Sequence, residues 1–191
     1  MYIHESSIVD DGAIIGENSK IWHFSHIMSS AIIGNNVTIG QNCFIGENVI
    51  IGNNVKIQNN VSLYEGIEVC NNVFIGPSAV FTNVVKPRSK FPTNKKYTKT
   101  VIKEGATIGA NATIVCGTVL GEHSFIGSGT VVTKNIPNNA LVVGNPSTII
   151  GWVGESGERL YIDGSLGIDK ELNIKYELTL EDSKIVNVTK I

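Results

Sequence analysis

An aliphatic residue recurs at every sixth position through most of the chain, and this period limits the folds that are possible. From Ile3 to Phe81 the spacing never slips, and it resumes in a shifted phase from Ile102 to Val132. Three residues after most aliphatic positions stands Asn or Gly, which tolerate the left-handed backbone of a sharp turn. Each hexad therefore predicts a short strand with an inward apolar side chain, followed by a turn.

Three such strands close a triangular coil of about 18 residues, stacked at the inter-strand spacing of roughly 4.8 Å. Six residues are too few for a repeat that contains a helix. About 20 hexads predict a parallel β-helix of between about six and seven coils, about 30 Å tall. The expected fold class is all-β: a β-helix of hexapeptide repeats with one inserted loop and a small C-terminal β appendage.

The repeat also predicts the domain organisation. Residues 1–150 are expected to form the β-helix domain, with an inserted basic loop at 87–101. The pattern stops near Pro137, and "ALVVGNPSTIIGW" is expected to lead the chain out of the coil. Residues 151–191 include the alternating run "KYELTLEDSKIVNV", which predicts a small appendage of β-strands that covers the open end of the prism.

Charge and cysteine usage exclude several classes of protein. The net charge of −2 provides no general attraction to nucleic acid. The three cysteines form no CxxC pair, which argues against a disulfide framework or a zinc ribbon and favours a reducing cytosol. The N-terminal stretch "MYIHESSIVD" lacks the features of a signal peptide, and no apolar run approaches the roughly 20 residues of a membrane helix. We therefore expect a cytoplasmic protein without membrane insertion.

The tandem hexads resemble those of the hexapeptide-repeat acyltransferases, whose fold is a left-handed β-helix. The handedness follows from this resemblance, because ordinary crossover rules favour the opposite hand. Four stretches narrow the likeness to bacterial enzymes that N-acetylate the 3-amino group of nucleotide-linked sugars: "IWHFSHI", "KIQNNVSLYEG", "VFIGPSAVFTNVVKPRS" and "TVIKEGATIGANATIVCGTVLGEHSFIG". The resemblance covers roughly residues 1–160 and implies a homotrimer that binds acetyl-CoA and a nucleotide sugar between subunits.

The resemblance implies one of two substrate subtypes and a role in the synthesis of bacterial surface glycans such as O-antigen or S-layer. One is a dTDP-3-amino-3,6-dideoxyhexose, and the other is UDP-2-acetamido-3-amino-2,3-dideoxyglucuronate. A uronate carboxylate is best held by a bidentate arginine, and Arg88 and Arg159 are the only arginines in the chain. This scarcity favours the neutral dTDP-linked sugar. Some relatives end in a cysteine-containing tail, but no cysteine follows Cys116 here, so no metal is expected.

The candidate site lies where the repeat breaks. Gln58 and Tyr64 stand at a position that glycine occupies in nine of the 20 hexads, including the four directly before Gln58. Because coils repeat every 18 residues or so, His23, Gln41, Asn59 and Pro77 are expected to stack in one column, and Glu47, Glu65 and Asn83 in the next. Polar residues that gather where the regular repeat is interrupted are candidates for a ligand-binding site. The predicted cluster comprises Gln58, Asn59, Asn60, Tyr64, Glu65 and Asn83, although Asn60 also fits an ordinary turn ladder.

Catalytic roles are predicted for Asn83, Glu65, His23 and His123. An unprotonated amine is already a nucleophile, so a side-chain base need not be essential. Asn83 and Glu65 are expected to orient the amine. His23 and His123 are candidates for acid–base catalysis, but each could instead donate a hydrogen bond to the sugar or base, or be an ordinary surface residue. His26 is a candidate for binding the substrate. His4 is expected to be structural.

The remaining predictions concern phosphates and the thioester. The segment from Lys86 to Lys99 carries six basic residues and no acid, which indicates either a solvated face or a lid over phosphates, with Arg88 and Phe91 as contacts. A backbone N–H near Gly109, Ala110 and Ala112 is expected to polarise the thioester carbonyl. The family resemblance also implies that Lys134 and Pro146 lie near the CoA tail.

Two other classes use the same fold. A γ-type carbonic anhydrase binds zinc through three histidines across an interface, but His23 and His26 lie on different sides of a turn and the later coils supply only His123. A purely structural β-helix would leave the basic loop and the break at Gln58–Glu65 unexplained.

Overall fold

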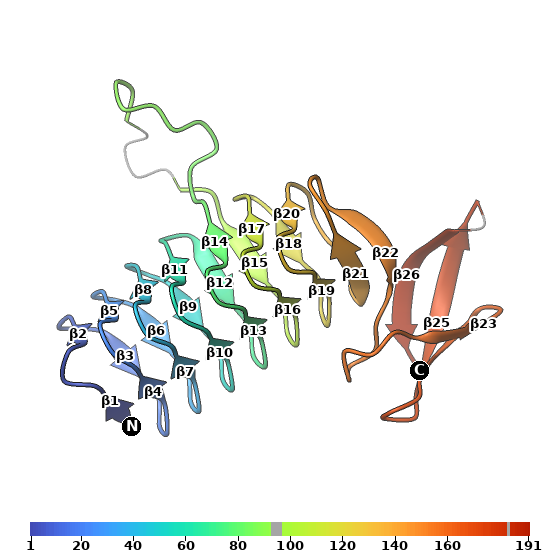
Figure 1. Ribbon diagram of the computed structural model, residues 1–191, viewed down its shortest axis with the longest axis horizontal. Helices are drawn as coiled ribbons and strands as arrows, with labels where there is room; N and C mark the ends of the chain where they lie inside the picture. The colour runs from blue at the N-terminus through green and yellow to red at the C-terminus, as the bar shows by residue number, and fades with distance from the viewer. Residues whose placement is uncertain (93–96, 183) are drawn as a thin grey trace.

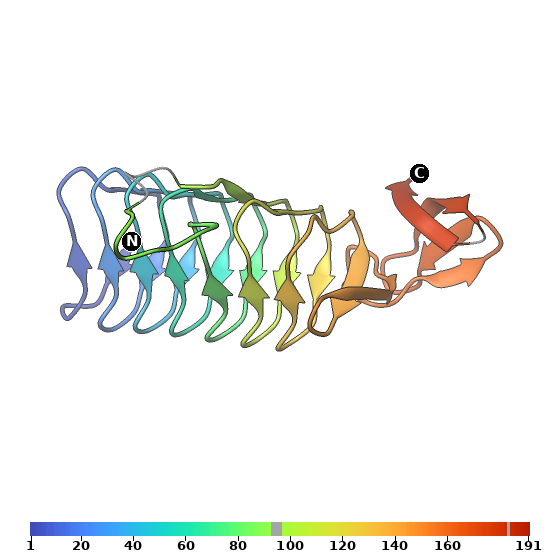
Figure 2. The same cartoon turned by 90° about the horizontal axis from the view of Figure 1, so that it is seen from above.

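The protein is a long triangular prism followed by a small sheet (Figure 1). The computed structural model describes residues 1–92, 97–182 and 184–191, and in these ranges it has 26 strands and no helix. Stacked parallel strands form a β-helix, so the predicted fold class is confirmed. Figure 2 shows the coils lying side by side along the long axis, with the C-terminal sheet beyond the last of them.

Three faces make up the prism. The first face contains β1 (Tyr2–Ile3), β4 (Lys20–Ile21), β7 (Thr38–Ile39), β10 (Lys56–Ile57), β13 (Phe74–Ile75), β16 (Thr107–Ile108), β19 (Phe125–Ile126), β21 (Ala140–Val143) and β22 (Thr148–Trp152). The second contains β2 (Ile8–Val9), β5 (His26–Ile27), β8 (Phe44–Ile45), β11 (Ser62–Leu63), β14 (Val80–Phe81), β17 (Thr113–Ile114) and β20 (Val131–Val132). The third contains β3 (Ile14–Ile15), β6 (Ile32–Ile33), β9 (Ile50–Ile51), β12 (Ile67–Val69), β15 (Thr100–Ile102) and β18 (Val119–Leu120).

Turns between the faces form three edges, which we number by the face they leave. The first edge includes residues 22–25, 40–43, 58–61, 76–79 and 109–112; the second includes 28–31, 46–49, 64–66, 82–92, 97–99 and 115–118; the third includes 34–37, 52–55, 70–73, 103–106 and 121–124. The predicted left-handed turn residues are confirmed, with φ near +57 to +61° at Asn36, Asn54 and Asn60. Phe24 and His123 occupy the same kind of turn position, with φ of 57° and 54°.

The second residue of each short strand fills the core. Ile21, Ile39 and Ile57 pair in register along the first face and are fully buried. Ile3 and Ile15 are only partly buried, because they lie in the N-terminal coil. Burial of stacked aliphatic side chains is the main favourable term for such a fold, at about 25 cal/mol per Å² of apolar surface.

Both ends of the inserted loop differ from the prediction. The loop begins after β14 at Phe81, and β15 already begins at Thr100 rather than after Val101. Thr100 is buried, and its Oγ1 accepts a hydrogen bond from the N–H of Gly117 (3.2 Å), so it belongs to the coil wall. Figure 1 shows the loop rising from the prism between β14 and β15.

The hexad pattern stops near Pro137, but the coil continues through one more strand. β21 pairs in parallel with β19 and adds another layer to the first face, because Ala140 and Val142 alternate inward and fill the coil. β22 then folds back antiparallel on β21.

Four antiparallel strands follow in one sheet: β23 (Tyr161–Asp163), β24 (Leu166–Asp169), β25 (Ile174–Glu181) and β26 (Lys184–Lys190). Trp152, Leu160 and Tyr176 belong to the same buried cluster as the prism core, so this sheet continues the apolar interior. The boundary between the two domains at residue 150 remains a prediction.

Candidate functional site

Asn83 and Glu65 lie together on the second edge, one coil apart. The Nδ2 atom of Asn83 donates a hydrogen bond to the main-chain oxygen of Glu65 (3.3 Å). The carboxylate Oε1 of Glu65 accepts a hydrogen bond from Asn48 Nδ2 (3.2 Å). The main-chain oxygen of Asn83 accepts from the N–H of Thr98 (2.9 Å), which attaches the returning end of the loop to the same corner. The coil turn and the loop root thus hold these two side chains in place.

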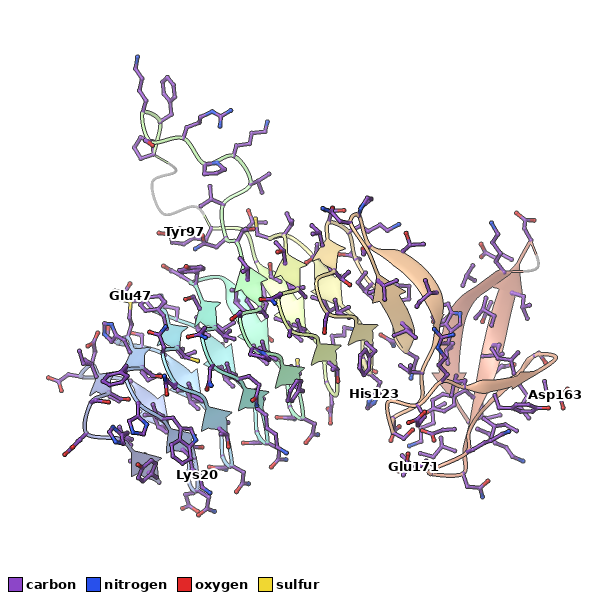
Figure 3. The ribbon with its side chains drawn as sticks, viewed as in Figure 1. Lys20, Glu47, Tyr97, His123, Asp163 and Glu171 are labelled. Atoms are coloured by element: carbon purple, nitrogen blue, oxygen red, sulfur yellow. The ribbon has the colours of Figure 1, made fainter. Side chains whose placement is uncertain are left out.

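Two cavities flank this corner. One, of about 230 Å³, is lined by Met28, Phe44, Gly46, Glu47, Tyr64, Glu65, Asn83 and Tyr97. The other, of about 320 Å³, is lined by Asn48, Ile50, Glu65, Gly66, Ile67, Glu68, Tyr97 and Lys99. Glu65 and Tyr97 line both, so the two cavities share this corner. Figure 3 labels Tyr97 at the base of the loop, above the corner that carries Glu47.

The smaller cavity combines acidic and apolar surfaces. Glu47 and Glu65 supply two carboxylates, and none of its described lining residues is a cation. Phe44 packs against Tyr64 with ring centroids 5.8 Å apart. Such a cavity suits a ligand that has an amine and an apolar face.

Sequence reasoning missed Tyr97. The residue follows four loop positions, 93–96, that lie outside the described residues, and nothing in the hexad pattern marks it. Its Cβ lies 3.5 Å from the position that a Cβ on Gly66 would occupy, so the fold brings it to the corner. The only available signal was an aromatic residue close to the point where the repeat resumes.

The predicted cluster is divided between two edges. Gln58 and Asn59 lie on the first edge, in a cavity of about 320 Å³ with Trp22, His23 and Gln41. Tyr64, Glu65 and Asn83 lie on the second edge. Asn60 accepts a hydrogen bond at Oδ1 from Asn42 Nδ2 (3.0 Å), as expected for a turn ladder, and also lines a small cavity with Tyr64. Consecutive hexads turn to successive edges, so Gln58 and Tyr64 do not meet within one chain.

The histidines lie in three different surroundings. His23 stacks on His4 with ring centroids 3.4 Å apart. His26 Nε2 lies 3.1 Å from Asp10 Oδ1 on the second face. His123 is on the third edge, with Nε2 3.9 Å from Glu155 Oε1, and Figure 3 places it beside the C-terminal sheet and away from Tyr97. Within one chain, His123 does not approach Glu65 or Asn83.

The loop residues Arg88 and Phe91 are exposed. Arg88 Nη1 donates a hydrogen bond to the carbonyl of its neighbour Pro87 (3.1 Å). The predicted loop bases Lys95 and Lys96 lie outside the described residues.

Among the described residues, the predicted thioester site has one main-chain N–H without an acceptor. The N–H groups of Gly109 and Ala112 donate within the coil, to Ile126 (2.7 Å) and Gly109 (3.3 Å). At several equivalent positions an asparagine of the next coil accepts from the main-chain N–H, as Asn59 Oδ1 does from the N–H of Gln41 (2.9 Å). The next coil has Ser128 at that position, and the hydrogen bonds of the described residues give the Ala110 N–H no acceptor. This N–H is therefore free to bind a ligand oxygen.

The two remaining predicted cofactor residues lie near the C-terminal end of the prism. The carbonyl of Gly144 accepts from the N–H of Val131 (2.9 Å), which places the turn containing Pro146 beside β20, just before Lys134. Both Lys134 and Pro146 are exposed.

In the described part of the chain, the cysteine, histidine and acidic side chains do not form a candidate metal site. No group of three His, Cys, Asp or Glu side chains suited to a metal ion occurs within residues 1–92, 97–182 and 184–191. Cys43 is buried in the core, and this burial raises the pKa of its thiol. Over the same described ranges, no helix is long and apolar enough to cross a membrane.

Solved structures with a similar fold include enzymes that transfer acyl groups. A mutant of AntD, an N-acyltransferase from Bacillus cereus in complex with dTDP and coenzyme A, matches with a TM-score of 0.51 and 19% identity, over 81% of this chain and 82% of that chain. The UDP-N-acetylglucosamine acyltransferase of Francisella novicida matches with a TM-score of 0.51 and 20% identity, over 79% and 68% of the two chains. At these identities the likeness concerns the fold alone.

Curated relatives match over shorter stretches. The dTDP-3-amino-3,6-dideoxy-alpha-D-galactopyranose 3-N-acetyltransferase of Aneurinibacillus thermoaerophilus is 44% identical over 70 residues, which is 36% of this chain and 36% of the relative. A 2,3,4,5-tetrahydropyridine-2,6-dicarboxylate N-acetyltransferase of Staphylococcus aureus is 33% identical over 84 residues, 44% of this chain and 32% of the relative. The matches thus span about a third of each relative's length.

Models of two repeat families match the chain. Hexapeptide repeat of succinyl-transferase matches residues 30–65. Bacterial transferase hexapeptide (six repeats) matches residues 2–47, 48–83 and 99–134, which is more than half of the chain. The protein therefore belongs to the bacterial hexapeptide-repeat transferase family.

Proposed function

We propose that the protein transfers the acetyl group of acetyl-CoA to the 3-amino group of a nucleotide-linked amino sugar. The observation that carries this proposal is the corner at which Glu65, Asn83 and Tyr97 meet between two cavities. The relative from Aneurinibacillus thermoaerophilus, an acetyltransferase of a dTDP-linked 3-amino sugar, supports the same chemistry.

Glu65 and Asn83 are assigned to the amine. The carboxylate of Glu65 attracts the protonated amine, and the Asn83 amide restricts its position. After the amine loses a proton, its lone pair attacks the thioester carbonyl. A C–N bond forms, the C–S bond breaks, the amide nitrogen loses a second proton, and CoA leaves as the thiol once its sulfur is protonated.

Ala110 is assigned to the thioester. Its N–H has no acceptor among the described residues and would donate to the carbonyl oxygen as negative charge develops there. Gly109 and Ala112 support this role through their own hydrogen bonds within the coil rather than by direct contact. Lys134 and Pro146 stay assigned to the CoA tail.

The other predicted residues keep their assignments as substrate groups. Gln58, Asn59, Asn60, Tyr64 and His26 are assigned to the nucleotide sugar, and Arg88 and Phe91 to its phosphates or those of CoA. His23 and His123 remain acid–base candidates. Because Ala110, Gln58 and Glu65 lie on two different edges, we also propose a homotrimer in which neighbouring copies complete each site. Acetyl-CoA and nucleotide sugars are cytoplasmic metabolites, so the proposed location is the cytoplasm.

The sugar we favour is a dTDP-3-amino-3,6-dideoxyhexose for surface-glycan synthesis. Glu47 and Glu65 would repel a uronate carboxylate, while Phe44 and Tyr64 offer an apolar wall to a 6-methyl group. Arg159 lies beside Gly151 of β22 and Arg88 lies on the inserted loop, so neither arginine lines the two cavities of the corner. The UDP-linked 3-amino uronate is the alternative.

The test is an acetyl-transfer assay that follows release of the CoA thiol with a panel of UDP- and dTDP-3-amino sugars. We expect turnover with at least one dTDP-3-amino-3,6-dideoxyhexose. A preference for the uronate would reverse the choice of sugar. Turnover with no amino sugar in the panel would overturn the proposed function.

A further inference from the structure

The cavity on the first edge has an unusual column of side chains. Trp22, Gly40 and Gln58 occupy equivalent positions in three successive coils, because the N–H of each donates to the next coil in the same way, to Ile39 (3.0 Å), Ile57 (2.8 Å) and Ile75 (2.9 Å). Trp22 and Gln58 carry long side chains, and Gly40 between them carries none. All three line the cavity of about 320 Å³.

This column leaves a slot of the right thickness for one flat ring. Two coil steps separate Trp22 from Gln58, or about 9.6 Å. A ring placed halfway, over Gly40, lies about 4.8 Å from each neighbour, within the range for stacked aromatic groups.

Aromatic side chains support one wall of the slot from the N-terminal side. The rings of Trp22 and His23 are nearly parallel, at an interplanar angle of 7°. His4 stacks on His23, and Tyr2 packs on Trp22 with ring centroids 5.5 Å apart. The contacts from the first coil hold the indole in place, and the cavity lies toward the coil that carries Gly40.

Amide groups surround the edge of the slot. Gln41, Gln58 and Asn59 all line the cavity. Asn59 Oδ1 already accepts from the N–H of Gln41 (2.9 Å), which leaves Asn59 Nδ2 as a donor. The Asn59 N–H also has no acceptor in the hydrogen bonds of the described chain, because Pro77 stands above it in the next coil and offers no side-chain oxygen. The edge therefore has more free donors than free acceptors.

We propose that this slot binds the pyrimidine base of the nucleotide sugar, stacked on Trp22 beneath Gln58 and read at its edge by Asn59 and Gln41. Thymine and uracil present two carbonyl acceptors and one N–H donor, which match a site rich in donors. The inference rests on the proposed function for the identity of the ligand and adds a base subsite that includes Trp22, Gly40 and Gln41. It also explains why glutamine replaces the glycine of the repeat at position 58.

Intrinsic fluorescence can follow this site directly. Trp22 and Trp152 are the only tryptophans, and Trp152 is buried in the core. In the full-length Trp152→Phe variant, Trp22 is the sole indole, and we expect dTDP or UDP to quench its emission. CoA and ADP provide the other source of a nucleobase, and we expect them to leave the emission unchanged.

Two substitutions at equivalent positions of the repeat provide the variant and its control. Gln58→Gly restores the usual residue of the hexad, so the fold is kept, and we expect dTDP to bind about tenfold more weakly. Cys70→Gly makes the same kind of change on the third edge, where no base is proposed, and should leave binding unchanged. Trp22→Ala lacks the fluorescent indole, so its affinity for dTDP must be measured by calorimetry. We expect that affinity to fall by a similar or larger factor. Gly40 is a poor target, because a Cβ there would lie 2.6 Å from Asn59 Oδ1.

The results separate this inference from the proposed function. Quenching by CoA but not by dTDP or UDP would overturn the pyrimidine assignment. Unchanged dTDP affinity in both Gln58→Gly and Trp22→Ala would overturn the base site, even if the protein transfers acetyl groups. Quenching by dTDP without acetyl transfer to any amino sugar would leave the base site standing and overturn the proposed function.

Discussion

The amide of Asn83 donates a hydrogen bond to the main-chain oxygen of Glu65 across one coil step, at 3.3 Å. This bond joins the last coil before the inserted loop to the coil beneath it. The chain returns to the same corner through the bond from the Thr98 N–H to the Asn83 oxygen (2.9 Å). The geometry of the candidate site therefore depends on a contact that ties the repeat to the loop.

Replacing these two residues should impair the chemical step. We expect Asn83→Ala and Glu65→Gln each to lower kcat/KM for acetyl transfer by about 10- to 100-fold, since a slightly misplaced reacting group can cost about 100-fold. Asn53→Ala and Glu17→Gln are matched controls, because these residues stand at the same position of the hexad on the third edge. Values within about threefold of wild type for both Asn83→Ala and Glu65→Gln would refute the assignment.

Arg88 should bind a phosphate group of the nucleotide sugar or of CoA through its positive charge. Its side chain is exposed on the loop, and Nη1 donates only to the carbonyl of the neighbouring Pro87 within the described hydrogen bonds. We expect Arg88→Ala to raise the KM of one substrate by about tenfold with little change in kcat. Salt should raise the wild-type KM more than that of the variant, because added ions screen the lost interaction. Lys175→Ala, an exposed change on β25, is the control; an equal effect there would contradict a specific role.

The glycines of the repeat should differ in their tolerance of alanine. A Cβ on Gly34 would lie 2.7 Å from the backbone of Gly52, whereas on Gly46 the nearest atom would be 3.1 Å away. We expect Gly34→Ala to lower the free energy of unfolding by about 1–3 kcal/mol, and Gly46→Ala by less. Urea denaturation measures both. The reverse order would show that the coil spacing relaxes more easily than the contacts indicate.

Asp169 should stabilise the C-terminal sheet in a pH-dependent way. Burial acts to raise its pKa, but hydrogen bonds from Ser156, Leu172 and Glu171 outweigh this effect and hold the pKa below the usual value. The stabilisation is therefore present above the ordinary pKa of about 3.9 and is lost as pH falls through the lower folded-state pKa.

Asp169→Asn tests that prediction. At pH 7 we expect the free energy of unfolding of the variant to be about 1–3 kcal/mol lower than that of wild type. This is the usual cost of removing hydrogen bonds to a charged group. The difference should shrink in acid, when the wild-type carboxyl is also neutral. Denaturation curves at several pH values provide the measurement, and a difference that does not change with pH would show that shape rather than charge matters at this position.

Much of the fold could be predicted because the hexad is a local rule. The inward positions of Ile21, Ile39 and Ile57, and the left-handed turns at Asn36 and Asn54, follow from residues within one repeat. The end of the coil could not be predicted in this way. Ala140 and Val142 continue the inward pattern after Pro137, but the turn before them lacks the regular hexad spacing.

The candidate site was only partly predictable. Stacking of Glu65 beneath Asn83 follows from the coil period and is present. The division of Gln58 and Tyr64 between two edges follows from the turn of each hexad to a new face, which sequence adjacency conceals. Tyr97 could not be found, because a loop of no fixed period separates it from Glu65.

The sequence by itself determined the β-helix, its buried aliphatic columns and the residues at its turns, because a six-residue period specifies strand, corner and inward side chain together. The tertiary structure alone decided which residues meet across long separations, such as Tyr97 with Glu65 and His123 with Glu155. Such contacts depend on where each coil and the inserted loop come to rest in space, and no local rule of the chain specifies that.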